Sequence, residues 1–119
     1  MDIESFREYV LSLPGTTEDT PFGEDVLVFR IEGKIFGCIA LDDPNICVLK
    51  CDAERAIVLR EHHSEIEGAY HWNKKYWNQI PFNRGVDDAT IRLLANHAYN
   101  EVVRKLPKKK QLEITLLDE

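Results

Sequence analysis

The sequence predicts a single two-layer α+β domain in which an antiparallel sheet packs against helices. The chain has 119 residues, enough for one hydrophobic core and too few for two ordinary domains. Segments with helical spacing of apolar residues are separated by short runs rich in Val, Ile and Phe. No linker, repeat or low-complexity segment divides the chain. The expected order of elements is therefore α-β-β-β-α-β-β-α.

The first half of the chain contains one helical pattern and three strand patterns. Ile3, Phe6 and Val10 recur at intervals of three and four residues, which is typical of an amphipathic helix. Glu32-Gly33 separates two β-rich runs and suits a two-residue hairpin turn. The elements expected here are a helix over 2–13, an acidic loop over 15–24, and strands over 26–31, 34–41 and 46–50.

The second half begins and ends with helical patterns. Asp52 and Asp87 are suitable N-caps for the two helices. Leu112, Ile114 and Leu116 alternate in the tail, which allows an edge strand, and a flexible tail is the alternative. The elements expected here are a helix over 52–62, two short strands within 65–82, a helix over 88–105, and the tail over 108–119.

The N-terminus and the cysteines favour a cytoplasmic protein. Acidic residues stand where a secretory signal has basic ones, and no apolar run approaches the roughly 20 residues of a membrane helix. Cys38, Cys47 and Cys51 form an odd set, which favours free thiols. Because four residues of a strand span about 13 Å, Cys47 and Cys51 do not suit one zinc ion or one disulfide. We expect buried cysteines and no metal.

The sequence lacks the common motifs of catalytic sites. It has no glycine-rich phosphate loop, no His-Glu-x-x-His helix and no Gly-x-Ser-x-Gly elbow. A cysteine and a histidine can still meet in space, but all three cysteines stand in apolar, strand-like surroundings. His97 borders the apolar stripe of the last helix, which predicts a boundary histidine with satisfied hydrogen bonds. We expect a protein that is not an enzyme and needs no cofactor.

The charge is unevenly distributed along the chain. A net charge of −6 argues against a general nucleic-acid binder, because Lys and Arg supply most of the affinity for phosphate. However, residues 1–69 hold 15 acidic and 6 basic side chains, whereas residues 70–110 hold 3 acidic and 9 basic ones. Such asymmetry between segments indicates a charged partner. The charge therefore argues against nucleic-acid binding by residues 1–69 and allows it for residues 70–110.

Residues 70–86 combine aromatic and basic side chains without an acidic residue. They hold five of the eleven aromatic residues, including both tryptophans. A tight turn at Asn73-Lys74 would place Trp72 opposite Lys75 and Tyr70 opposite Trp77, all on one face of a hairpin. A straight strand would put the tryptophans on opposite faces. A third alternative is that the aromatic rings fill the core while the lysines are solvated.

These features make a set of residues candidates for binding DNA. Four of them, Lys34, Lys74, Lys75 and Arg84, are expected to contact phosphates. Trp72 or Trp77 would stack on bases or fit their shape, and Asn73 and Asn78 would read base edges. The full set of candidates is Lys34, Tyr70, His71, Trp72, Asn73, Lys74, Lys75, Trp77, Asn78 and Arg84.

Several motifs resemble those of the MmcQ/YjbR family of small bacterial proteins. The most specific is the run from Ala69 to Asn78, Ala-Tyr-His-Trp-Asn-Lys-Lys-Tyr-Trp-Asn. The other motifs are Leu13-Pro14-Gly15, Pro21-Phe22-Gly23, Gly33-Lys34-Ile35-Phe36-Gly37, Leu49-Lys50-Cys51-Asp52, Ala98-Tyr99-Asn100-Glu101-Val102-Val103 and Leu106-Pro107-Lys108-Lys109. The chain differs from many members at His97, where they have Ser.

The resemblance implies a fold similar to the double-wing DNA-binding domain and to secretion chaperones. It supports a non-enzymatic DNA-binding protein as the leading hypothesis, by fold analogy alone. The alternative is an adaptor that binds a protein or peptide and has no role with nucleic acid; the acidic first half favours it, because that half would repel a polyanion. An enzyme with an unrecognised pocket ranks third.

Overall fold

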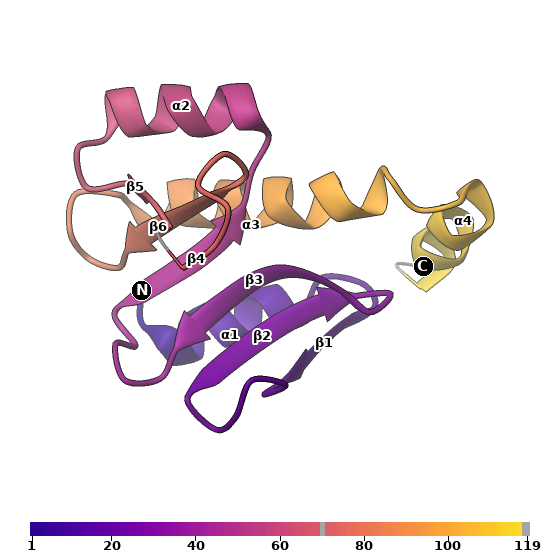
Figure 1. The fold of residues 1–119 in the computed structure, drawn as a ribbon. Helices are drawn as coiled ribbons and strands as arrows, with labels where there is room; N and C mark the ends of the chain where they lie inside the picture. Colours follow the sequence, from indigo (N-terminus) through magenta and orange to yellow (C-terminus); the bar gives the residue numbers. More distant parts are fainter. Residues whose placement is uncertain (70, 118–119) are drawn as a thin grey trace.

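The computed structural model describes residues 1–69 and 71–117 and has a sheet in front of two helices (Figure 1). The strands are β1 (Thr16–Asp19), β2 (Val26–Ile31), β3 (Lys34–Ala40), β4 (Ile46–Lys50), β5 (Glu67–Gly68) and β6 (Trp77–Pro81). They form one antiparallel sheet in the order β1-β2-β3-β4-β6-β5. The helices are α1 (Ile3–Leu11), α2 (Ala53–His62), α3 (Asp88–Val103) and α4 (Lys108–Leu117). The predicted α+β class is confirmed.

Most of the predicted elements are confirmed within two residues of their bounds. Asp52 and Asp87 accept hydrogen bonds from the backbone N–H groups of Arg55 and Thr90, and thus cap α2 and α3 as predicted. Glu32 and Gly33 have φ angles of 50° and 77°, so they form the predicted turn between β2 and β3. Local signals therefore determine these elements.

The loop predicted over residues 15–24 is wrong over its first part, which forms β1. Its sequence, Thr-Thr-Glu-Asp, has no apolar alternation, so pattern alone does not reveal a strand. The strand exists because it pairs with β2, from Thr16 opposite Ile31 to Asp19 opposite Val28. Ion pairs between Glu18 and Arg7 and between Asp19 and Arg30 hold it at the edge of the sheet.

The edge strand allowed for the tail is also wrong, because Lys108–Leu117 form α4. The backbone N–H groups of Lys110 and Gln111 donate to the carbonyl of Pro107 and close the first turn. Lys, Gln, Leu and Glu are strong helix formers, whereas the alternation suggested a strand. Ile114 is buried in the main core, and this contact selects the helix.

The two faces of the sheet have different environments. Phe29, Leu49 and Ile80 lie on the inner face, where they pack with Phe6 of α1 and Ile91 of α3 in the main core. The outer face carries the alternate residues, which the register aligns as Val28, Cys38, Val48 and Gln79 across four strands. The candidate site lies on this outer face.

Cys38, Cys47 and Cys51 are buried and free, as predicted. Burial raises the pKa of Cys38 to about 12 and that of Cys51 to about 11, and it raises that of Cys47 further. A thiolate is therefore disfavoured at neutral pH at each of these positions. Within the described residues, no helix is long and apolar enough to span a membrane.

Candidate nucleic-acid interface

Residues 71–76 form a wide loop that leads into β6, so the alternative of a tight turn at Asn73-Lys74 is wrong. The register pairs Gly68 with Asn78, and the N–H of Ala69 donates to the carbonyl of Trp77 at 3.1 Å. The turn at Asn73 is instead closed by the N–H of Tyr76, which donates to the carbonyl of Asn73. The side chain of Asn73 accepts a hydrogen bond from the N–H of Lys75 at 3.0 Å. An asparagine-initiated turn thus replaces the two-residue hairpin.

Both tryptophans lie on the outer face of the sheet, Trp77 in β6 and Trp72 in the loop before it. The rings of Trp72 and Trp77 have their centroids 4.6 Å apart, and the edge of Phe22 approaches Trp72 with centroids 6.4 Å apart. Trp77 is buried, with 8% of its surface exposed, Trp72 is half-buried, and Phe22 is 62% exposed. Trp77 therefore belongs to the protein interior, while Trp72 and Phe22 reach the solvent. Tyr70 lies outside the described residues.

Lys50 lies beside this aromatic stack, and Lys75 lies over the neighbouring Tyr76. The ammonium of Lys50 lies 5.4 Å from the ring centroid of Trp77, and that of Lys75 lies at the same distance from Tyr76. Burial lowers the pKa of Lys50, and the nearby Lys105 lowers it further. Arg60 of α2 donates to the carbonyl of Lys74 at 3.1 Å and so ties the loop to that helix. Lys50 was not among the predicted residues, although strand alternation places it on the same face as Trp77.

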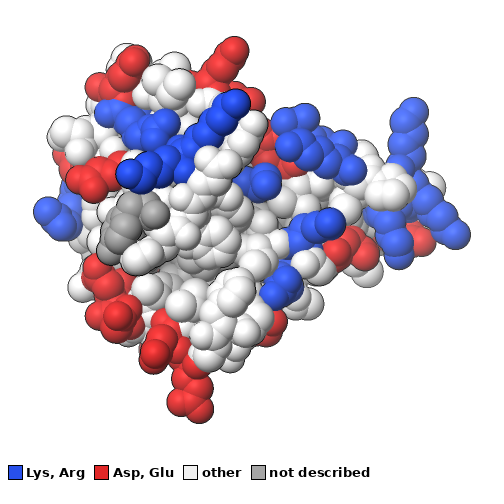
Figure 2. Space-filling view, in the orientation of Figure 1, with Lys and Arg blue, Asp and Glu red and all other residues white. Residues whose placement is uncertain are grey.

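A pocket opens beside the stack. Its volume is about 650 Å³, within the range of small-ligand sites. Side chains of β2, β3, β4 and β6 form its floor, and residues of three loops form its walls. The lining residues are Phe22, Val26, Cys38, Ala40, Asp42, Asp43, Ile46, Val48, Ala69, His71, Trp72 and Gln79. Figure 2 shows uncharged side chains in the middle of this view, with basic side chains above them and acidic side chains at the lower left.

Two of the predicted residues, Lys34 and Asn78, do not join this face, and Arg84 lies at its border. Lys34 pairs with Ile31, whose side chain is in the core, so Lys34 projects toward the inner side of the sheet. Arg84 borders the face: it lines a neighbouring hollow with Glu65 and Glu67, and this hollow shares Ile46 and Gln79 with the pocket. Asn78 is 1% exposed and donates to the carbonyl of Ala56 at 3.3 Å, so its assignment as a reader of base edges is wrong.

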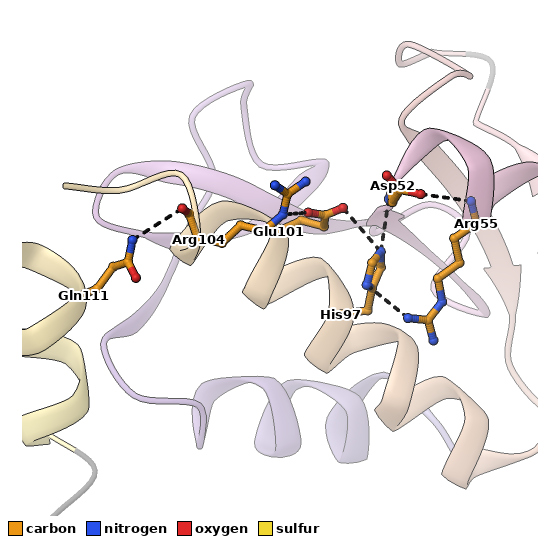
Figure 3. Close-up of polar contacts among 6 residues, drawn as sticks. All are labelled: Asp52, Arg55, His97, Glu101, Arg104 and Gln111. Atoms are coloured by element: carbon orange, nitrogen blue, oxygen red, sulfur yellow. Dashed lines mark hydrogen bonds and ion pairs between the residues drawn. The ribbon is translucent and has the colours of Figure 1, made fainter. Parts of the chain in front are cut away.

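A polar network fixes the ends of the helices behind this face (Figure 3). Nε2 of His97 accepts a hydrogen bond from the backbone N–H of Asp52 at 3.0 Å, and Nδ1 lies 3.2 Å from the guanidinium of Arg55. Glu101 forms an ion pair with Arg104 and lies 3.7 Å from Nε2 of His97. His97 is thus the predicted boundary histidine: its Nε2 is bonded to the backbone of Asp52, and the side chain joins α3 to the start of α2.

The network also determines the charge of its members. Burial lowers the pKa of His97, and the positive charge of Arg55 acts in the same direction. The hydrogen bond from Arg104 lowers the pKa of Glu101, so its carboxylate stays ionised. Because the N–H of Asp52 donates to Nε2, the neutral ring carries its proton on Nδ1. The network therefore holds a neutral histidine and has a structural role.

The fold defines the chain as a small two-layer α+β protein whose outer sheet face carries an aromatic stack and a pocket. The chain belongs to the YjbR family, whose model matches residues 11–101. It is 31% identical over 112 residues to the uncharacterised protein YbdF of Escherichia coli O157:H7. The aligned residues cover 93% of this chain and 92% of that protein. It is 24% identical to the uncharacterised YjbR of Escherichia coli K12, over 93% of this chain and 95% of the relative.

Solved structures show the same fold. A crystal structure of a Deinococcus radiodurans protein with a DUF419 domain superposes with a TM-score of 0.88 at 26% identity, covering 96% of this chain and 88% of that one. A Pseudomonas syringae protein superposes with a TM-score of 0.71 at 23% identity, covering 85% of this chain and 98% of the other. The curated relatives are named as uncharacterised proteins, so the comparisons establish the family and leave its activity to be proposed.

Proposed function

We propose that this chain is a non-enzymatic DNA-binding protein of the cytoplasm that holds a single strand on the outer face of its sheet. The observation that carries the proposal is the aromatic stack of Phe22, Trp72 and Trp77 with the ammonium of Lys50 beside it. Sites for single strands combine aromatic rings with cations that follow the backbone. Free buried cysteines fit a reducing compartment.

The exposed aromatic rings supply the stacking surface. Phe22 is largely exposed and Trp72 half-buried, so each has ring surface that a base can cover. Such stacking contributes on the order of 1 to 3 kcal/mol per base. Trp77 supports Trp72 from below, which keeps that ring in place without a cost on binding. Trp77 therefore contributes to binding by positioning Trp72, although it is itself buried.

The phosphates would be held by Lys50, Lys74 and Lys75. Lys74 and Lys75 are kept from the predicted set, and Lys50 replaces Lys34 and Arg84, because neither of these two contacts the stack. Lys74 and Lys75 are exposed on the loop, and Arg60 fixes the backbone of that loop. The acidic side chains on the opposite edge restrict a polyanion to this part of the face (Figure 2). Binding should consequently be weak and sensitive to salt.

The test is fluorescence anisotropy with a labelled 12-nucleotide strand at low salt. The variant Lys74→Glu/Lys75→Glu should lose at least tenfold in affinity. A matched control is Lys108→Glu/Lys109→Glu, which makes the same change of charge on α4, away from the stack. Affinity should change little in this control. Equal losses in the two variants, or no binding of single- or double-stranded DNA by the wild type, would contradict the proposal.

A second candidate is an adaptor that binds a protein or peptide, and the pocket favours it. The pocket is mostly apolar, has Asp42 and Asp43 in its wall, and lies on a face with both signs of charge. This combination also suits a polypeptide with apolar and basic side chains. A stoichiometric protein partner that is retained by the variant Lys74→Glu/Lys75→Glu would favour the adaptor over the DNA-binding protein.

A further inference from the structure

We propose that the pocket on the outer sheet face takes one base of a bound strand and selects bases with an exocyclic amino group over thymine. The inference rests on the proposed function and adds a specificity to it. Its basis is the position of Asp42 and Asp43 in the wall of a pocket that is otherwise apolar and flanked by the aromatic stack. The two carboxylates would accept hydrogen bonds from the amino group.

The shape of the pocket suits a flat ring. Its floor consists of small and β-branched side chains of the sheet, among them Cys38, Ala40 and Val48, which leave a smooth surface. Trp72 and Phe22 form a wall, and their rings meet nearly edge to face with an angle of 74°. A base that enters would have the sheet on one side and an aromatic ring beside it. A volume of about 650 Å³ is sufficient for a purine or a pyrimidine with part of its sugar.

A row of outer-face side chains runs from Lys50, which lies outside the pocket, to the acidic turn in the pocket wall. On the outer face of β4, alternation places Lys50, Val48 and Ile46 in one row that ends at the turn with Asp42 and Asp43. Lys50 and Ile46 are about 13 Å apart along this row, at roughly 3.3 Å per residue. A nucleotide laid along it would have its phosphate near Lys50 and its base toward the carboxylates. In this orientation the negative phosphate lies near the ammonium of Lys50, and the amino group of the base lies near the carboxylates of Asp42 and Asp43.

The carboxylates account for the selection. Ionised Asp side chains only accept hydrogen bonds, and an amino group such as N4 of cytosine donates them. The donor of thymine on the same edge is N3–H, which stands between two carbonyl oxygens that an approaching carboxylate would repel. Asp42 and Asp43 are the charged residues of the described pocket lining, so no Lys or Arg there would favour those oxygens. His71 and Gln79 complete the polar lining, and Gln79 donates to Glu67 at 3.4 Å.

The experiment compares labelled strands of twelve dC, twelve dA and twelve dT nucleotides by anisotropy. The wild type should bind the dC and dA strands roughly tenfold more tightly than the dT strand. The variant Asp42→Asn/Asp43→Asn should bind all strands better, because two negative charges are removed, but the ratio between dC and dT should fall to about one. The control Glu24→Gln/Asp25→Asn removes the same charge from the preceding loop and should keep the ratio. All four residues are exposed, so these variants should fold.

The outcomes separate the specificity from the function. Equal affinity of the wild type for dC, dA and dT strands, with a loss in Lys74→Glu/Lys75→Glu, would overturn the base selection and leave DNA binding in place. A ratio that survives in Asp42→Asn/Asp43→Asn would also overturn it, because the carboxylates would not be its cause. No binding of any strand would overturn the proposed function and, with it, this inference.

Discussion

The ring of Trp72 lies against the ring of Trp77, with centroids 4.6 Å apart and planes inclined by 37°. The two residues are five apart in sequence and are brought together because the loop over residues 71–76 folds back onto the outer face of the sheet. Trp77 is buried in β6, whereas Trp72 is half-buried and lines the pocket. One tryptophan therefore supports the fold and the other presents its surface to a ligand.

This division predicts different costs for the two alanine variants. Trp77→Ala should lower the free energy of unfolding by about 3 to 5 kcal/mol, because it removes a large buried side chain. Trp72→Ala should cost about 1 to 2 kcal/mol, since it removes a half-buried ring and one aromatic contact. Urea denaturation measures both values. If the two losses were equal, the assignment of Trp77 to the interior and Trp72 to the surface would be incorrect.

Salt dependence reports how many phosphates the face neutralises. If Lys50, Lys74 and Lys75 each hold one phosphate of a single strand, the logarithm of the binding constant should fall with the logarithm of salt at a slope of about −2. Anisotropy titrations at several salt concentrations measure this slope. Lys75→Gln should make it shallower, whereas Lys109→Gln on α4 should leave it unchanged. A flat salt dependence in the wild type would exclude phosphate contacts.

His97 should make the protein less stable as the solution becomes mildly acidic. Its pKa in the folded protein is lowered from the ordinary value of 6.5 by burial and by Arg55, so the unfolded chain binds the proton more readily. The stabilisation is complete above that value and is lost as the pH falls toward the folded pKa. Protonation would also prevent Nε2 from accepting the N–H of Asp52.

The variant His97→Gln tests this pH dependence. Glutamine keeps an acceptor for the N–H of Asp52 but does not titrate, so its stability should fall less between pH 7.5 and pH 5.5 than that of the wild type. Thermal unfolding in buffers of equal ionic strength gives the comparison. His62→Gln, at an exposed position on α2, is the control and should behave as the wild type. Parallel curves for wild type and His97→Gln would show that His97 does not cause the effect.

Alanine variants at two glycines with positive φ angles can be compared directly. Gly15 and Gly33 have φ angles of 76° and 77°, so alanine at either position costs about 1 to 2 kcal/mol in backbone strain. At Gly15 a Cβ atom would also lie 2.8 Å from Cδ1 of the buried Ile31, whereas the space at Gly33 is open. Gly15→Ala should therefore lose more stability than Gly33→Ala in urea denaturation. The reverse order would contradict the close contact.

The sequence determined the elements whose signals are local. Apolar periodicity, the Asp caps and the Glu32-Gly33 turn predict α1 to α3 and the strands β2, β3 and β4, because each signal acts within a few residues. The burial of the three cysteines and the boundary role of His97 also followed from their neighbours in sequence. The aromatic and basic composition of residues 70–86 marked the region of the candidate site.

Only the tertiary structure decided the elements and the contacts that depend on distant partners. β1 requires the edge of β2, and α4 requires the core surface that buries Ile114. The position of Lys50 beside Trp77, the burial of Asn78 and the separation of Lys34 from the stack follow from strand register. The pocket between the sheet and Trp72 follows from the path of the wide loop. Each depends on free energies of packing between segments far apart in sequence, which no local pattern encodes.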